Sequence, residues 1–219
     1  RESEILLLPG QKFQVISHQS GEPGVTVIQL KEDNTQSISK QYTNKELEEK
    51  IVSCSSHVWI DLGQLGLIDT DMSIVANQAI IKKQCEVLDL GNNNIGPQGA
   101  SIISSVLAKA PKFKRLYLGG NRVSDDGVHY LQDPVANSFL VVLGLSENMI
   151  TDNGAISLSK MLQKNPRLTV LGLENNEIGD LGVKHISSAL KHNTQLVRLY
   201  LSNNKMISLD EKLPYGIAS

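Results

Sequence analysis

Aromatic residues, cysteines and long apolar segments are all scarce in this chain of 219 residues. Aromatic side chains make up only 4% of the sequence, so a core must be built mainly from Leu, Ile and Val. The two cysteines, Cys54 and Cys85, are too few for a disulfide framework, and we expect two free thiols. No apolar run approaches the ~20 residues that a membrane helix requires. The composition therefore favours neither a disulfide-rich module nor a membrane segment.

A charge excess of either sign is also missing. The 21 basic and 23 acidic side chains give a formal net charge of −2. This balance does not favour a nucleic-acid partner. The histidines are scattered, and because no pair has a third ligand nearby we expect no metal site. Glycine loops that bind nucleotides and the nucleophile elbow G-x-S-x-G are absent as well.

The sequence is rich, by contrast, in one repeated phrase, L-x-L-x-x-N-x-[IVM]. A degenerate copy begins at Ile60, and full copies follow at intervals of 28, 28, 27, 28 and 28 residues, at Leu88, Leu116, Leu143, Leu171 and Leu199. A period of ~20–29 residues with this pattern is typical of leucine-rich repeats. The phrase resembles the ribonuclease-inhibitor type of these repeats. We predict a leucine-rich-repeat domain over residues 57–210, with about five to six repeats.

Each repeat predicts one strand and one helix. The leucines of L-x-L point inward from a short strand. The asparagines satisfy backbone groups where the chain turns in, and we expect them to stack as an internal ladder of Asn93, Asn121, Asn148, Asn176 and Asn204. A glycine then opens the return helix, with apolar pairs four residues apart at Ile103 and Leu107, Leu158 and Leu162, and Ile186 and Leu190. The predicted fold class is α/β: a right-handed, curved solenoid with parallel concave strands and convex helices, preceded by a small β-strand remnant of an upstream domain.

The residues between the inward leucines should face the concave side in two columns. The first column contains Trp59, Val87, Arg115, Val142, Val170 and Arg198. The second contains Asp61, Asp89, Tyr117, Gly144, Gly172 and Tyr200. Because Arg and Tyr are common at binding hot spots, we predict a protein-binding face made by Trp59, Asp61, Asp89, Arg115, Tyr117, Arg198 and Tyr200. The alternative is an ordinary solvated sheet without a partner.

The first 56 residues carry no repeat. Strands are expected at 5–8, 12–17 and 25–30, and residues 31–56 are expected to form a linker and a capping helix. Thr43 and Glu46 have the spacing of a capping box, and Leu47 and Ile51 share one helix face. At the other end the pattern decays into a tail, residues 211–219, with no capping helix evident. Since the chain begins at Arg1 on what reads as mid-domain sequence, we interpret it as a fragment or a processed chain.

Residues 2–30 resemble the end of the arginine-specific mono-ADP-ribosyltransferases. The resemblance is carried by an E-x-E turn (Glu2 to Glu4), by I-L-L-L-P-G at 5–10 with F-Q-V at 13–15, and by the strand G-V-T-V-I-Q-L at 24–30. The resemblance implies transfer of ADP-ribose from NAD, as a substrate, to an arginine side chain of an acceptor protein. It implies that Glu4 binds the ribose of NAD and stabilises the positive charge that develops there. It also implies that Glu2 orients the acceptor guanidinium.

The family's upstream arginine and S-T-S strand cannot be identified in this sequence. We therefore expect residues 1–219 alone to be inactive, whatever a longer protein does. The leading hypothesis is part of an arginine-directed ADP-ribosyltransferase whose repeats bind a protein. The alternatives are a non-enzymatic adaptor and a regulator similar to the ribonuclease inhibitors or GTPase activators that use this repeat. The compartment, the oligomeric state and the identity of the partner stay open.

Overall fold

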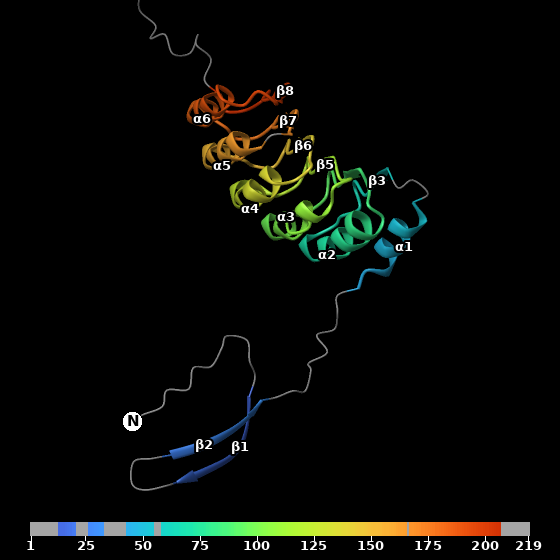
Figure 1. The fold of residues 1–219 in the computed structure, drawn as a ribbon, viewed down its shortest axis with the longest axis vertical. Helices are drawn as coiled ribbons and strands as arrows, with labels where there is room; N and C mark the ends of the chain where they lie inside the picture. The colour runs from blue at the N-terminus through green and yellow to red at the C-terminus, as the bar shows by residue number, and fades with distance from the viewer. Residues whose placement is uncertain (1–12, 21–25, 33–42, 55–57, 166, 207–219) are drawn as a thin grey trace, which may run out of the picture. The chain divides into compact units, whose positions relative to one another are not determined.

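The computed structural model describes residues 13–20, 26–32, 43–54, 58–165 and 167–206 of the chain (Figure 1). The chain forms two compact units, Arg1–Tyr42 and Thr43–Ser219, which are described separately. The E-x-E residues Glu2 and Glu4, the strand expected at 5–8 and the tail at 211–219 lie outside the described residues.

The first unit contains a β-hairpin. Strand β1 (Phe13–Ser20) pairs antiparallel with strand β2 (Thr26–Glu32), and the register shifts between Val15 and Ser17. Both strands were expected from the sequence, and each ends two or three residues later than the expected segment.

The second unit contains a six-stranded parallel sheet in which each strand pairs with the strand of the next repeat. The order along the sheet equals the order along the chain, which is the topology of a solenoid (Figure 1). The strands are β3 (Trp59–Asp61), β4 (Val87–Asp89), β5 (Arg115–Tyr117), β6 (Val142–Gly144), β7 (Val170–Gly172) and β8 (Arg198–Tyr200).

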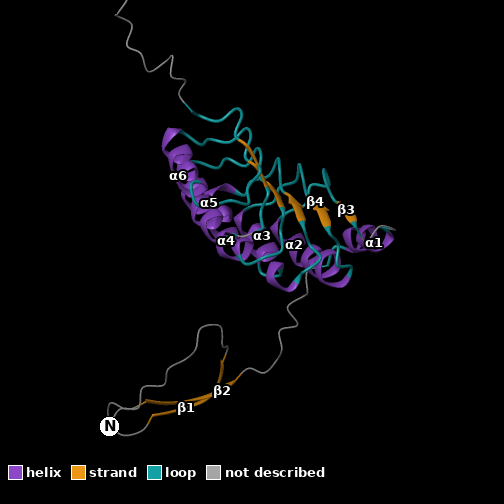
Figure 2. Ribbon diagram, turned by 45° about the horizontal axis from the view of Figure 1, so that its top comes forward, coloured by secondary structure: helices purple, strands orange, loops and turns teal. Residues whose placement is uncertain are grey.

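Helices lie along the other side of the solenoid, and the strands line its inner side (Figure 2). The first repeat returns through a short 3₁₀ turn η1 (Asp69–Asp71), helix α2 (Met72–Val75) and a π-helix η2 (Ala76–Lys82). The later return helices are α3 (Pro97–Ser104), followed by a 3₁₀ turn η3 (Leu107–Lys109), then α4 (Ser124–Ala136), α5 (Asp152–Lys164) and α6 (Asp180–Leu190). The predicted α/β leucine-rich-repeat solenoid is therefore confirmed.

One detail of the helix prediction was wrong. Leu107 does not share helix α3 with Ile103, because α3 ends at Ser104 and Leu107 lies in η3. Ile186 and Leu190 do lie on one helix, α6, as predicted, and Leu190 packs against the core although it is only half-buried.

The core lies between the strands and the helices. Leu88, Leu116, Leu143 and Leu171, the first leucines of four repeats, are all fully buried. Burial of one such side chain contributes about 1.5–3 kcal/mol. Leu199 in β8 is only half-buried, so the last described strand is less well covered than the others.

The asparagine ladder runs along the inside of the turns that follow the strands. Asn121 is typical: its Oδ1 accepts from the N–H of Ile95 at 2.9 Å, and its Nδ2 donates to the carbonyl oxygens of Leu90 and Leu118 at 2.9 and 3.0 Å. Each ladder residue therefore joins its own repeat to the preceding one. Equivalent bonds are made by Asn93, Asn148, Asn176 and Asn204, as predicted.

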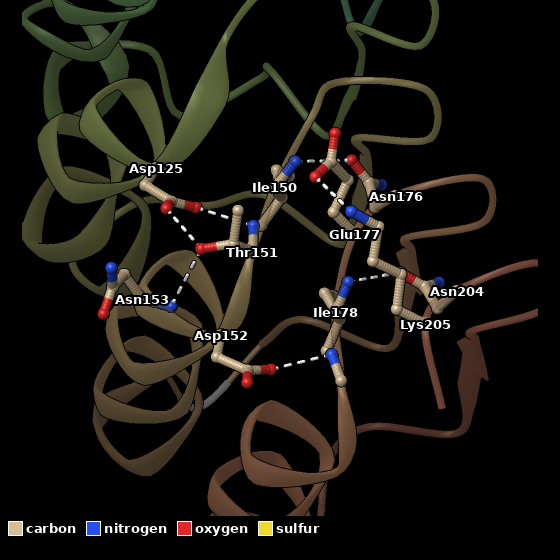
Figure 3. Close-up of polar contacts among 11 residues, drawn as sticks. Asp125, Ile150, Thr151, Asp152, Asn153, Asn176, Glu177, Ile178, Asn204 and Lys205 are labelled. Carbon is tan, nitrogen blue, oxygen red and sulfur yellow. Dashed lines mark hydrogen bonds and ion pairs between the residues drawn. The ribbon is translucent and has the colours of Figure 1, made fainter. Parts of the chain in front are cut away.

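A second series of polar contacts, made by aspartates at the helix N-termini, was not expected. In each case the carboxylate accepts from one or two backbone N–H groups at the start of the next repeat's helix, where the helix dipole favours negative charge. Figure 3 shows the contacts of Asp125 and Asp152. Asp69 accepts from Gly96, Asp125 accepts from Thr151 and Gly154, and Asp152 accepts from Gly179 and Gly182.

Pro97 stands at the equivalent position of helix α3 and has no carboxylate. The N-cap of the following helix, Val123, has φ −60 and ψ −40, whereas the N-cap Thr151 is extended with φ −104 and ψ −169. Ser124 then adopts φ 55, and its N–H donates to the carbonyl oxygen of Asn148 at 3.0 Å. The helix start of this repeat thus takes a different path from that of the repeats preceded by an aspartate.

Helix α1 (Lys45–Ser53) packs against α2 and η2 at the N-terminal end of the solenoid. Leu47 and Ile51 are buried in the same core, as their spacing predicted. The N-cap is Asn44 rather than Thr43, because the Oδ1 of Asn44 accepts from the N–H of Leu47 at 3.1 Å. The Nδ2 of Asn44 also donates to Asp71 at 2.8 Å, which ties the helix to the first repeat.

Candidate protein-binding surface

The concave face is formed by the outward residues of six three-residue strands. The register pairs Trp59 with Val87 and Asp61 with Asp89, and it continues without a shift to β8. The middle residue of each strand points into the core, so its two neighbours point outward. The structure therefore brings the two predicted columns together on one surface.

Arg115 and Tyr117 form the first arginine–tyrosine pair, on β5. Arg115 is exposed and Tyr117 is half-buried. Tyr117 lies in register with Gly144, where an added Cβ would come within 3.1 Å of the tyrosine Cδ1. The glycine therefore allows the ring to lie across the neighbouring strand, which holds the phenol in one place on the surface.

Arg198 and Tyr200 form the second pair, on β8. Both side chains are exposed, and Tyr200 retains 46% of its accessible area. Tyr200 lies in register with Gly172 of the preceding strand, where an added Cβ would meet Glu174 and Ser146 first, so the ring-to-glycine contact of the first pair is not repeated. Three inter-strand steps of ~4.8 Å separate the pairs by about 14 Å, a distance that one folded partner can span.

Trp59, Asp61 and Asp89 form the N-terminal end of the face. Trp59 is 56% exposed. The carboxylates accept from the N–H groups of Gly63 and Gly91, at 2.9 and 2.8 Å, and these bonds fix their orientation. They line a shallow hollow of about 360 Å³, open to solvent, at the ends of β3 and β4. An exposed indole on the same strand as Asp61 is suited, together with the two carboxylates, to a cationic side chain of a partner.

The middle of the face is smaller and less polar. Val142 and Val170 are half-buried there, beside the two glycines. The two predicted columns did not include Glu174, which follows β7 by two residues and accepts from the Ser146 hydroxyl at 2.5 Å. Aligning the repeats of the sequence beyond the L-x-L strand would have placed Glu174 in the loop that follows the strand, next to the concave face.

The predicted catalytic pair, Glu2 and Glu4, lies outside the described residues. Within the described part of the chain, no group of three or more His, Cys, Asp or Glu side chains is arranged to hold a metal ion. No helix in that part combines the length and apolarity needed to cross a bilayer. The candidate site is therefore a broad, shallow surface with cations, carboxylates and aromatic rings.

Comparison with known proteins agrees with this architecture. The family described as "Leucine Rich repeat" matches residues 86–104, 109–131, 136–159 and 164–187. A curated relative, FERM domain-containing protein C of Dictyostelium discoideum, is 28% identical over 119 residues, which make up 53% of this chain. The match spans only 8% of that protein's length.

Two solved structures share the fold. Leiomodin-1 actin-binding site 2 has a TM-score of 0.52 at 20% identity, over 61% of this chain and 76% of that one. The tropomodulin C-terminal domain of Caenorhabditis elegans has a TM-score of 0.54 at 12% identity, over 68% of this chain and 91% of that one. At these identities the likeness concerns the fold alone. The second unit is a leucine-rich-repeat solenoid of the α/β class.

Proposed function

We propose that the concave face of the solenoid binds a folded protein through two arginine–tyrosine pairs and the Trp59–Asp61–Asp89 end. The observation that carries this proposal is the register, which gathers seven exposed or half-exposed polar and aromatic side chains on one side of one sheet. Such side chains supply contact area and charge-assisted hydrogen bonds where a partner excludes water. The mixed charges favour a partner with a basic patch opposite Asp61 and acidic patches opposite the arginines.

The test is a binding experiment with matched variants. A photoreactive amino acid at Val142, in the middle of the face, should crosslink the partner, which is then purified and titrated by calorimetry. Replacing Arg115 and Arg198 with Ala should weaken binding by at least about tenfold, or 1.4 kcal/mol. Replacing Lys160 and Lys184 with Ala, two exposed residues of the helices, should leave the affinity unchanged. Equal losses in both double variants would contradict the proposal.

The solved neighbours do not supply the partner's identity. The leiomodin-1 segment is named as an actin-binding site, and that property belongs to leiomodin-1. A purified partner from the crosslinking experiment would decide between an adaptor and a regulator, because these two functions use the same surface and differ only in what is bound.

We propose, as a second function, that residues 1–30 are the closing strands of an arginine-specific ADP-ribosyltransferase domain that uses NAD. The resemblance over residues 2–30 supports this, and the antiparallel pairing of β1 and β2 is compatible with it. Glu4 would stabilise positive charge on the ribose, and Glu2 would orient the arginine of the acceptor protein. The solenoid would then bring the acceptor or a regulator to the enzyme.

Labelled NAD and the arginine analogue agmatine test this second proposal. We expect no transfer by residues 1–219, since the arginine and the S-T-S strand of the family are not identifiable in this sequence. A longer protein containing these residues should transfer ADP-ribose and lose the activity in the Glu4→Gln variant. An inert longer protein, or full activity of its Glu4→Gln variant, would refute the assignment.

A further inference from the structure

One edge of the solenoid is strongly basic, although the whole chain carries a net charge of −2. This edge consists of the segments that connect each helix to the following strand, residues 82–86, 105–114, 137–141, 163–169 and 191–197. Their only acidic residue is Glu86, and Asp133 of α4 also reaches this edge through its ion pair with Lys164. Their basic residues are Lys82, Lys83, Lys109, Lys112, Lys114, Lys164, Arg167 and Lys191. Parallel strands in register place all these segments at the same edge of the sheet.

The opposite edge is acidic. The loops after the strands and the first turns of the helices contain Asp69, Asp71, Asp125, Asp126, Glu147, Asp152, Glu174, Glu177 and Asp180. Arg122 and Lys205 are the basic residues in the described part of these segments. The fold thus separates charges that are mixed along the sequence, and a separated charge creates a field that attracts an oppositely charged partner.

Several cations of the basic edge already have partners within the protein. The Nζ of Lys83 donates to the two carbonyl oxygens at the end of α1, at 3.0 and 2.6 Å. Lys114 and Arg167 lie over the ring of Phe139, at 5.1 and 4.9 Å from its centroid. Lys164 pairs with an aspartate of α4 at 3.0 Å. Of these four cations only Lys164 is paired with an opposite charge, and the other three are held in place by contacts within the protein.

Lys82, Lys109 and Lys112 differ, because all three are exposed and none makes an ion pair with a described residue. Lys109 and Lys112 border a hollow of about 150 Å³ between the connections that lead to β4 and β5. Of its apolar lining residues, Ile81 and Pro111 are exposed, whereas Ile80 and Phe113 are buried in the core beneath them. We call this hollow, with Lys109 and Lys112 at its border, the basic pocket.

We propose that the basic pocket binds an acidic segment of another protein, with one apolar side chain of that segment in the hollow. Its volume is well below the ~300–1,000 Å³ of small-molecule sites, so it suits a single side chain. The lysines supply the complementary charge for carboxylates on either side of that residue. The exposed apolar residues Ile81 and Pro111 favour a peptide over a nucleic-acid backbone, which has no apolar side chain to place against them.

Fluorescence anisotropy of the full chain with a labelled peptide, Asp-Glu-Asp-Leu-Phe-Asp-Glu-Asp, tests this proposal. We expect saturable binding that weakens at least about tenfold in the Lys109→Glu/Lys112→Glu variant. A peptide of equal charge with Ser-Ser in place of Leu-Phe should bind about tenfold more weakly, because it leaves the hollow empty. Added salt should weaken the binding of both peptides, because it screens the charges.

The Lys160→Glu/Lys184→Glu variant is the matched control, because it changes the net charge equally at exposed helix positions away from the pocket. Its affinity should stay within about twofold of the original chain. Circular dichroism verifies that both variants are folded. Binding weaker than about 1 mM, equal binding of the Ser-Ser peptide, or equal loss in the control would overturn the proposal. Phosphatidylserine vesicles and oligothymidine are tested in the same way. If either binds more tightly than the peptide, and this binding depends on Lys109 and Lys112, the basic edge binds another kind of anion and the proposal is also overturned.

Discussion

Replacing Asn148 with Ala tests whether the asparagine ladder stabilises the solenoid. Asn148 is completely buried. Its Oδ1 accepts from the N–H of Val123 at 3.0 Å, and its Nδ2 donates to the carbonyl oxygens of Leu118 and Ser146, both at 2.9 Å. Alanine would remove all three bonds. The N–H of Val123 would lose its acceptor, whereas the carbonyl oxygens of Leu118 and Ser146 keep their bonds from Asn121 Nδ2 and from the N–H of Gly120.

The expected loss follows from one unpaired group and two lost bonds. A buried polar group left without a partner, here the N–H of Val123, costs about 1–3 kcal/mol. Each lost bond to a carbonyl that keeps another donor costs about 0.5–1.5 kcal/mol. We therefore expect the free energy of unfolding to fall by about 2–4 kcal/mol. This is a large part of the roughly 5–15 kcal/mol that stabilises a typical domain.

Urea unfolding followed by far-UV circular dichroism measures this loss. The control is Asn94→Ala, which alters an exposed asparagine of a ladder turn and should change stability by no more than about 0.5 kcal/mol. Hydrogen exchange should show reduced protection at the amide of Val123, since that amide loses its acceptor. A loss below about 1 kcal/mol for Asn148→Ala would refute the argument that the ladder satisfies otherwise unpaired groups.

Two further predictions concern the packing between repeats. Gly154→Ala would place a Cβ 2.5 Å from both Asp125 Oδ1 and Ile150 Cγ2. The clash should outweigh the helix preference of Ala and lower stability by about 1–2 kcal/mol in a calorimetric scan; a raised melting temperature would contradict this. Burial raises the pKa of the Cys85 thiol from 9.0 to about 12. The neutral thiol therefore stabilises the folded state fully below pH 9, and this contribution is lost as the pH rises from 9 to 12. At pH 8 a thiol reagent should modify half-buried Cys54 first and Cys85 only after unfolding; equal native rates would show that Cys85 is accessible.

Much of the fold could be predicted from the spacing of leucines and asparagines. Each strand position, such as Leu88 or Leu171, repeats at a fixed interval, and a parallel stack requires equal intervals to keep its register. The two concave columns could be assigned correctly for the same reason. An asparagine such as Asn121 has an amide that can pair with backbone groups of its own turn, so the residue type itself indicates a position inside the turn.

The remaining features depend on contacts between repeats, which no single repeat contains. The aspartate at 125 could have been noticed as the start of D-x-G, yet its acceptor role depends on the N–H groups of Thr151 and Gly154 in the next repeat. The N-cap at Asn44 is favoured over Thr43 by its bond to Asp71, 27 residues away.

The sequence by itself determined the repeat length, the inward leucines, the asparagine ladder and the membership of the concave columns, because these follow from a periodicity that every repeat shares. Only the tertiary structure decided which charges meet. Lys82 and Lys112 lie 30 residues apart in the chain, and both belong to the basic edge because stacked repeats bring their connections side by side. Charge interactions depend on distance through space, and a near-neutral composition gives no indication of that separation.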